Sequence, residues 1–69
     1  MNYGKAFGLA KNGDMIAREA WSSNKYVTFK DGNVQFNTKP QLLVTEGNNT
    51  RAWVAYPEDT EAQDWVTLG

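Results

Sequence analysis

The first part of the chain has the apolar spacing of an α-helix. Its apolar side chains recur at intervals of three and four positions, which places them on one helical face. The residues concerned are Tyr3, Ala6, Phe7, Leu9 and Ala10. Asn2 is a suitable N-cap, since its side chain can accept a hydrogen bond from the first turn, and Asn12 and Gly13 supply a helix stop. The pattern therefore predicts one short N-terminal helix.

Beyond this helix the pattern becomes the alternation typical of β-strands. The clearest stretch is residues 25–30, where Val27 and Phe29 point to one face of a sheet and their neighbours to the other. Residues 31–33 (Asp-Gly-Asn) predict one hairpin turn, and residues 46–49 (Glu-Gly-Asn-Asn) predict a second. Further strands are predicted at residues 15–21, 34–36, 42–45, 50–56 and 65–68.

Pro57 ends the strand pattern, and the composition changes after it to the acidic stretch Glu58–Asp64. A proline at the first helical position and carboxylates in the first turn favour one or two helical turns at residues 58–63. The predicted fold class is therefore α+β. An N-terminal helix packs on an antiparallel sheet of about five strands, with a short helical insert before the last strand.

The length of the chain limits how it can be stabilised. With 69 residues and 7.8 kDa, it forms one small domain, residues 1–69. A domain of this size buries only about 60% of the surface that its unfolded chain exposes. Cys and His are both absent, which excludes disulfides and the usual zinc sites. Self-association is the source of stability that remains, so we expect a homo-oligomer.

The charge balance argues against polymeric nucleic acid as a partner. The formal net charge is −1 and the pI is about 5.1, whereas proteins that grip a phosphate backbone normally carry a basic patch. No apolar run approaches the length of a membrane span, and the first residues lack the apolar block of a signal peptide. We therefore expect a cytoplasmic protein without a membrane partner.

The residue types also narrow the possible chemistry. Without Cys and His the chain has no thiol nucleophile and no imidazole acid or base. Paired carboxylates in the acidic stretch could bind Mg²⁺ or transfer protons, but a solvated first helical turn explains them as well. The stretch also lacks the alternate ligands and the glycine of a calcium loop. We predict no enzymatic activity, no catalytic residues, no metal and no cofactor.

The aromatic and arginine side chains are the strongest candidates for binding. Trp65 precedes alternating apolar residues and is expected in the core. Trp21 and Trp53 fit two interpretations: they pack in the core, or they present ring faces on which a nucleobase stacks. Arg18 and Arg51 likewise either point to solvent or pair with a phosphate, as the planar guanidinium does well.

Three stretches, taken together, resemble the Thoeris anti-defence two family of small phage and bacterial proteins. The first is residues 2–21, with an aromatic first turn, a Lys before a Gly, and an Arg shortly before a Trp. The second is the Pro-led segment Pro40–Leu43, and the third is residues 53–68, which contain two Trp and an Ala-x-Asp-Trp close. The matching positions are Lys11, Gly13, Arg18, Trp21, Trp53, Ala55, Asp59, Ala62, Asp64 and Trp65.

The resemblance implies a function that composition does not give. Proteins of this family are phage-encoded sponges that assemble as homotetramers. They enclose cyclic nucleotide immune signals, chiefly glycocyclic ADP-ribose, in pockets between subunits without cleaving them. The host defence effector that awaits the signal then stays inactive. For this chain the resemblance implies a cyclic nucleotide ligand, a tetramer or a dimer, and a place in the host cell cytoplasm.

Under this function the predicted ligand site draws on both ends of the chain. The tryptophans supply stacking faces, an aspartate accepts from ribose hydroxyls or the base, and an arginine pairs with phosphate. The predicted ligand-binding residues are Trp21, Trp53, Asp59, Arg18, Asn24 and Tyr56. Family members commonly have Ser-Gln where this chain has Tyr56 and Pro57, so its ligand contacts differ there.

A protein partner is the alternative. The composition is also that expected of a small acidic phage protein that inhibits a host enzyme by direct contact. The acidic stretch would then be a negatively charged surface that binds a basic site. Calorimetry with cyclic nucleotides separates the two functions.

Overall fold

The first element is helix α1 (Tyr3–Lys11), which both of its caps define. The Asn2 side chain accepts a 2.8 Å hydrogen bond from the backbone N–H of Lys5, as expected of an N-cap. Asn12 is the C-cap, and Gly13 follows with a φ of 105°, a backbone conformation that suits glycine. The predicted N-terminal helix and its ends are therefore confirmed.

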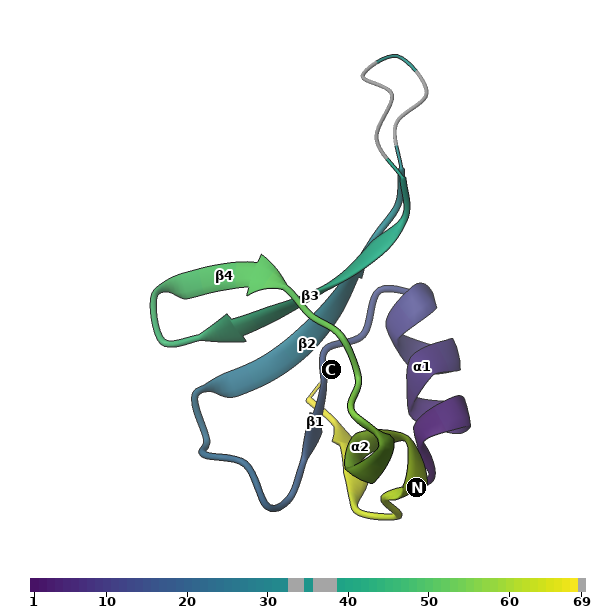
Figure 1. Cartoon of the computed structure of the whole chain (residues 1–69), viewed down its shortest axis with the longest axis vertical. Helices are drawn as coiled ribbons and strands as arrows, with labels where there is room; N and C mark the ends of the chain where they lie inside the picture. Colours follow the sequence, from purple (N-terminus) through teal and green to yellow (C-terminus); the bar gives the residue numbers. More distant parts are fainter. Residues whose placement is uncertain (33–34, 36–38, 69) are drawn as a thin grey trace.

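The computed structural model describes residues 1–32, 35 and 39–68. In this part of the chain the strands form one antiparallel five-stranded sheet in the order β4-β3-β2-β1-β5 (Figure 1). Helix α2 (Pro57–Glu61) precedes the last strand. The α+β class, the sheet of five strands and the helical insert are confirmed. The strands are β1 (Ile16–Arg18), β2 (Lys25–Lys30), β3 (Gln41–Glu46), β4 (Asn49–Ala52) and β5 (Trp65–Thr67).

The predicted strand boundaries hold best where the pairing is local. Strand β2 has the predicted bounds, and the turn at residues 46–49 joins β3 to β4. The predicted strand 34–36 and part of the turn 31–33 lie outside the described residues. Two predicted strands, 15–21 and 50–56, are shorter in the structure. Strand β1 ends at Arg18, where the chain turns and the N–H of Trp21 donates to the carbonyl of Arg18. Strand β4 ends at Ala52, where the chain leaves the sheet and continues to α2.

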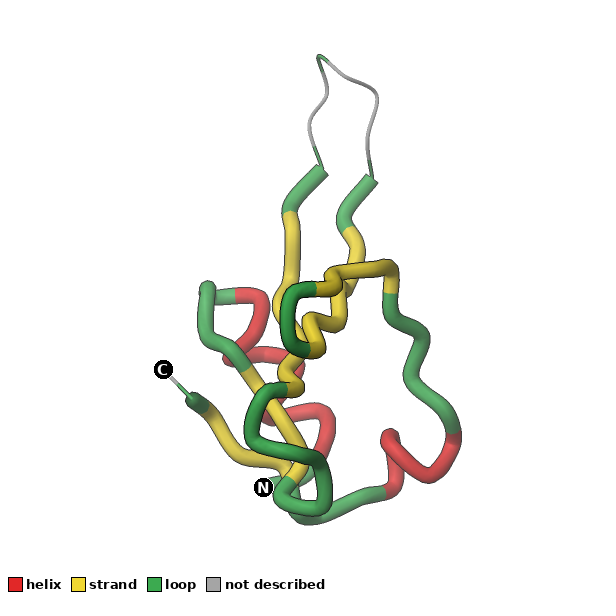
Figure 2. The backbone as a smooth tube through the Cα atoms, turned by 90° about the vertical axis from the view of Figure 1, so that its left-hand side faces the viewer, coloured by secondary structure: helices red, strands yellow, loops and turns green. Residues whose placement is uncertain are grey.

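Helix α1 lies against the sheet, where it contacts β1, β2 and β5, and α2 packs against α1. Figure 2 shows the segment that links β4 to α2 running down one side of the molecule. Its first residue, Trp53, still donates its N–H to the carbonyl of Leu42 in β3. No described helix covers the opposite face of the sheet. Within the described residues, neither helix has the length or apolarity to cross a bilayer. The buried core consists of Ala6, Ala10, Ile16, Val27, Val44 and Trp65.

Candidate functional site

The three tryptophans form one cluster on the helix-covered side of the sheet. Trp65 is fully buried, which confirms its predicted place in the core. Trp21 and Trp53 pack against it edge to face, with ring centroids 5.3 and 6.1 Å from that of Trp65 and 6.1 Å from each other. Both are only partly buried. Each therefore contributes to the core and still keeps part of its ring exposed.

A lysine lies over one of these exposed rings. The Nζ atom of Lys25 is 4.4 Å from the ring centroid of Trp21, a distance at which the cation is attracted to the negative face of the indole. Lys25 is the first residue of β2 and shares a sheet face with Val27. The contact fixes an ammonium group beside the tryptophan cluster.

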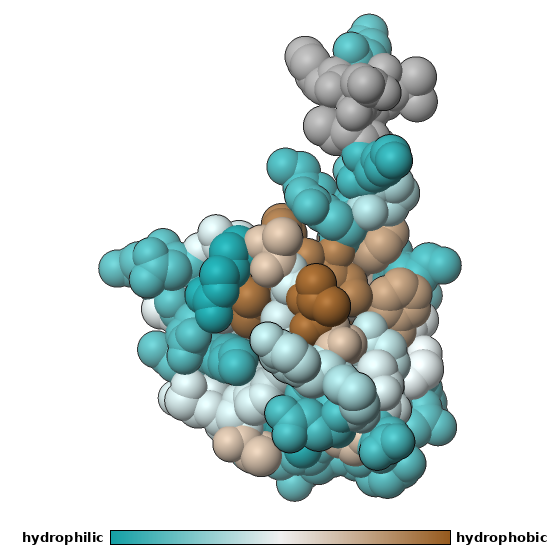
Figure 3. Space-filling view, in the orientation of Figure 1, coloured by the Kyte–Doolittle hydropathy of each residue, from teal (hydrophilic) through white to brown (hydrophobic). Residues whose placement is uncertain are grey.

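Next to this cluster the surface has a hollow of about 270 Å³. Its floor is Val44, which is buried, and its sides combine aromatic and cationic side chains, without an acidic residue. Figure 3 shows apolar side chains gathered near the centre of this face of the molecule, within a largely polar surround. The hollow is lined by Lys25, Val44, Arg51, Ala52, Trp53, Val54 and Tyr56.

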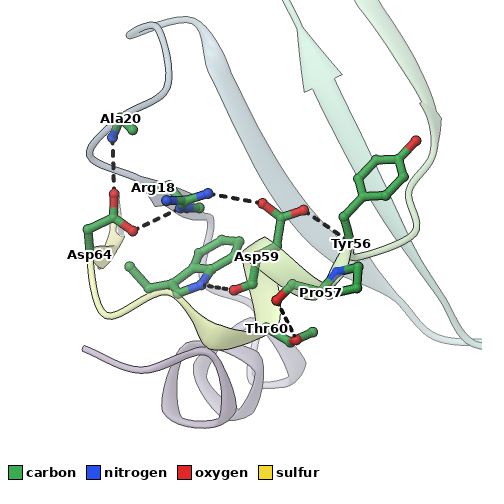
Figure 4. A network of polar contacts seen from close by, with 8 residues as sticks. Arg18, Ala20, Tyr56, Pro57, Asp59, Thr60 and Asp64 are labelled. Atoms are coloured by element: carbon green, nitrogen blue, oxygen red, sulfur yellow. Dashed lines mark hydrogen bonds and ion pairs between the residues drawn. The ribbon is translucent and has the colours of Figure 1, made fainter.

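The polar network beside the hollow centres on Arg18 (Figure 4). Its Nε donates to Asp64 Oδ1 over 2.8 Å, and its Nη1 donates to Asp59 Oδ1 over 3.2 Å. The backbone N–H of Ala20 donates to the other oxygen of Asp64. The hydrogen bond from Arg18 holds the pKa of Asp64 below its ordinary value, and the same bond raises the pKa of the guanidinium. A phosphate at Arg18 would therefore compete with two carboxylates.

The same network fixes the start of α2. Asp59 is buried, and its second carboxylate oxygen accepts a 3.0 Å hydrogen bond from the backbone N–H of Tyr56 (Figure 4). Its backbone carbonyl accepts a 2.8 Å hydrogen bond from the indole N–H of Trp65. Tyr56, whose side chain is exposed, is therefore held at the edge of the hollow by Asp59 and, through it, by Arg18.

Asn24 lies on the connection between β1 and β2. Its side-chain oxygen accepts a 2.9 Å hydrogen bond from the Ser22 hydroxyl, and its backbone carbonyl accepts one from the N–H of Gly47 in the β3–β4 turn. These bonds bring the start of β2 close to that turn. Asn24 is exposed and precedes Lys25, but it does not line the hollow.

The structure thus divides five of the six predicted binding residues into two groups, and Asn24 belongs to neither. Trp53 and Tyr56 line the hollow, and Trp21 reaches it through Lys25. Arg18 and Asp59 lie in the ion-paired network behind it, and their direct contact with a ligand stays a prediction.

Two cations of the hollow were absent from the predicted set of binding residues. Lys25 was not considered, and Arg51 was weighed as a phosphate partner but not included; strand alternation is informative for both. Lys25 alternates with Val27 and therefore lies on the core side of β2, while Arg51 alternates with Trp53.

The geometry suits an anionic ligand with a flat ring. Trp53 and Tyr56 offer aromatic surface, and Lys25 and Arg51 offer positive charge. Among residues 1–32, 35 and 39–68, no group of three acidic, His or Cys side chains is placed to hold a metal ion. Binding of a nucleotide-like molecule is the chemistry that these side chains offer.

Comparison with known proteins adds one match. A family model described as the Thoeris anti-defense 2-like (Tad2-like) domain matches residues 1–68. No curated protein matches the sequence. The family match covers almost the whole chain and confirms the resemblance carried by its two ends and the Pro40 segment.

Proposed function

Because this chain belongs to the Thoeris anti-defense 2-like family, which acts against the Thoeris defence system, we propose that it is a sponge for a cyclic nucleotide signal. The ligand is of the glycocyclic ADP-ribose type, and it is held in the host cytoplasm without being cleaved. The defence effector then lacks its activator. The observation that supports this most directly is the lining of the hollow, where aromatic rings stand beside two cations, of which Arg51 is only loosely paired with Glu46.

Each part of such a ligand has a matching side chain. A nucleobase presents a flat π surface, and stacking on an aromatic side chain contributes about 1–3 kcal/mol per base. Trp53 and Tyr56 provide that surface in the hollow. The sugar hydroxyls need acceptors and donors. The exposed Asn24 side chain can donate through its amide N–H groups, while its oxygen already accepts from Ser22.

The size of the hollow favours a site that two copies of the chain complete. Pockets that enclose a small molecule usually measure about 300–1,000 Å³, and the hollow of one chain is about 270 Å³. Val54 and Tyr56 at this place are 77% and 66% exposed, so apolar surface remains uncovered in the single chain. A homo-oligomer, a tetramer or a dimer, would cover that surface and close the pocket around the ligand.

A sponge must bind tightly and must not react. A dissociation constant near 1 nM corresponds to about −12 kcal/mol, which a ligand largely enclosed between subunits can reach. No carboxylate of the described residues lines the hollow; Asp59 and Asp64 are engaged by Arg18, and Glu46 contacts Arg51. We therefore expect the ligand to be released chemically unchanged.

Isothermal titration calorimetry with glycocyclic ADP-ribose and related cyclic nucleotides tests the proposal. We expect exothermic binding by the whole chain, and recovery of intact ligand by mass spectrometry after the protein is denatured. Absence of heat with every signal would contradict the proposal and favour a protein inhibitor. For that alternative the acidic stretch offers Glu58 and Glu61, which are exposed, whereas Asp59 and Asp64 are paired with Arg18. Ligand recovered in altered form would indicate an enzyme.

A matched pair of variants locates the site. Tyr56→Leu removes an aromatic side chain from the hollow, whereas Tyr26→Leu removes one from the opposite face of the sheet. We expect Tyr56→Leu to weaken binding about tenfold, the loss of one modest stacking contact. Tyr26→Leu should leave the affinity unchanged, and native mass spectrometry should show that both variants keep the wild-type assembly. Equal effects of the two changes would place the site elsewhere.

A further inference from the structure

We propose that Lys25 and Arg51 bind the phosphate groups of the ligand, and that Trp21 positions Lys25 for this contact. The inference rests on the proposed function and names the phosphate end of the same site. It also moves the predicted phosphate contact from Arg18 to two cations that line the hollow.

The sheet register places the two cations on either side of one floor residue. Val44 of β3 is paired with Val27 of β2 and with Arg51 of β4, so all three lie in one row across the sheet. Lys25 lies two residues before Val27 on the same face of β2. The two cationic side chains therefore flank Val44 from the two strands that neighbour β3, and both line the hollow.

The local charge contrasts with that of the whole chain. The protein carries a net charge of −1, yet the hollow is lined by two cations and by no carboxylate. Arg18 differs, because its guanidinium is already paired with Asp59 and Asp64 at 3.2 and 2.8 Å. The hollow is thus a place where an anion would find two cations together and no carboxylate among the described residues of the lining.

Arg51 is only loosely engaged. Its Nη2 atom is 3.7 Å from a carboxylate oxygen of Glu46, and the two side chains are 60% and 46% exposed. An ion pair of this length between solvated groups contributes little. A phosphate could replace this one long contact by two parallel hydrogen bonds from the guanidinium.

Lys25 is held in place without being neutralised. Its ammonium lies 4.4 Å from the centre of the Trp21 ring, and among the described residues it forms no ion pair, although Glu46 is its cross-strand partner on β3. The cation–π contact restricts a side chain that is otherwise flexible. Because the ring is not a carboxylate, the ammonium N–H groups can still donate hydrogen bonds to a ligand. Trp21 thereby acts on the ligand through Lys25.

The test compares charge-removing variants with a matched surface lysine. Lys25→Gln and Arg51→Gln each remove one cation from the hollow, while Lys30→Gln removes one from the opposite face of the same strand β2. Calorimetry with glycocyclic ADP-ribose is carried out on each whole-chain protein at about 50 and about 300 mM NaCl, where surface charges are weakly and strongly screened. Thermal unfolding shows that the variants remain folded.

We expect Lys25→Gln and Arg51→Gln each to weaken binding at least about tenfold, as the loss of one charge-assisted contact does. The double variant should also lose most of the salt dependence of the affinity. Lys30→Gln should bind as the wild type does, and Lys25→Arg should restore most of the affinity.

Trp21→Leu tests the positioning role. It should weaken binding in the wild type but cause little additional loss in the Lys25→Gln background, because the two residues act through one contact. A merely structural role of Trp21 would give equal losses in both backgrounds and would overturn this part of the inference.

The outcomes separate this inference from the proposed function. If the wild type binds the signal and the Lys25→Gln and Arg51→Gln variants bind it equally well, the phosphate assignment is wrong and the sponge function stands. If the wild type binds none of the cyclic nucleotides, both fail. Weakened binding in these variants, with Lys30→Gln unaffected, supports both.

Discussion

The indole N–H of Trp65 donates a 2.8 Å hydrogen bond to the backbone carbonyl of Asp59, and both residues are buried. The bond ties the first residue of β5 to the third residue of α2. A helix as short as α2 is not stable on its own, so its position depends on tertiary contacts of this kind. Because Asp59 also holds the backbone of Tyr56, the geometry of the hollow depends indirectly on the core.

Trp65→Phe should therefore destabilise the fold. The change removes the N–H donor, leaves the Asp59 carbonyl buried without this partner, and reduces the volume of the central ring. We expect a loss of about 2–3 kcal/mol in the free energy of unfolding, measured by urea denaturation. Trp53→Phe is the control. Because Trp53 is only partly buried, this variant should lose less than half as much free energy of unfolding. Equal losses would show that Trp53 is as central to the core as Trp65.

The sequence predicts well those features that depend on neighbouring residues. The ends of α1 were predictable because Asn2 and Gly13 act within one helical turn of their partners. The bounds of β2 were predictable because alternation is a local pattern. The early end of the predicted strand 50–56 was not, since its last residues leave the sheet to join α2.

The site was predictable only in part, because long-range pairing decides its layout. The two carboxylates bonded to Arg18 are 46 and 41 positions away along the chain, and no local pattern indicates them. The sequence therefore suggested that Arg18 is unpaired and available to bind a phosphate. Trp53 and Tyr56 were identified from their type, whereas Lys25 and Arg51 reach the hollow through the register of three strands.

The two arginines should respond very differently to the same substitution. Arg18→Met leaves the carboxylate of Asp59, whose side chain is 7% exposed, without its cation. We expect a loss of about 3 kcal/mol in the free energy of unfolding, as for a broken buried ion pair. Arg51→Met breaks only an exposed contact and should change stability by less than about 0.5 kcal/mol. Chemical denaturation of both variants measures the difference, and similar losses would contradict the division of roles between the two residues.

The stability of the fold should fall in acid, in part through Asp64. The hydrogen bond from Arg18 holds the pKa of Asp64 below its ordinary value of 3.8, so the unfolded chain takes up this proton more readily than the folded one. The resulting stabilisation is complete above the ordinary pKa and is lost as the pH falls through the lowered one. Urea midpoints measured from about pH 6 to about pH 2 should show this loss.

Asp64→Asn is the variant that isolates this contribution. Asparagine keeps the shape of the side chain but does not titrate, so the variant should be less stable near neutral pH and should lose less stability on acidification than the wild type. Identical pH profiles for the two proteins would show that Asp64 does not couple folding to protonation. The difference between the two profiles is the quantity to measure, because it isolates the contribution of Asp64.

Two glycines at the N-terminal helix should respond to alanine with opposite signs. Gly8 lies inside α1, and a methyl group added there meets no atom within 4 Å, so Gly8→Ala should stabilise the fold by about 0.5–1 kcal/mol through the unfolded state. Gly13 has a φ of 105°, which an alanine adopts only under strain, so Gly13→Ala should cost about 1 kcal/mol or more. Thermal unfolding at low and high protein concentration measures both changes. A Gly8→Ala variant that loses stability only at high concentration would show that a second copy of the chain packs closely against this face of α1, because the single chain leaves the space open.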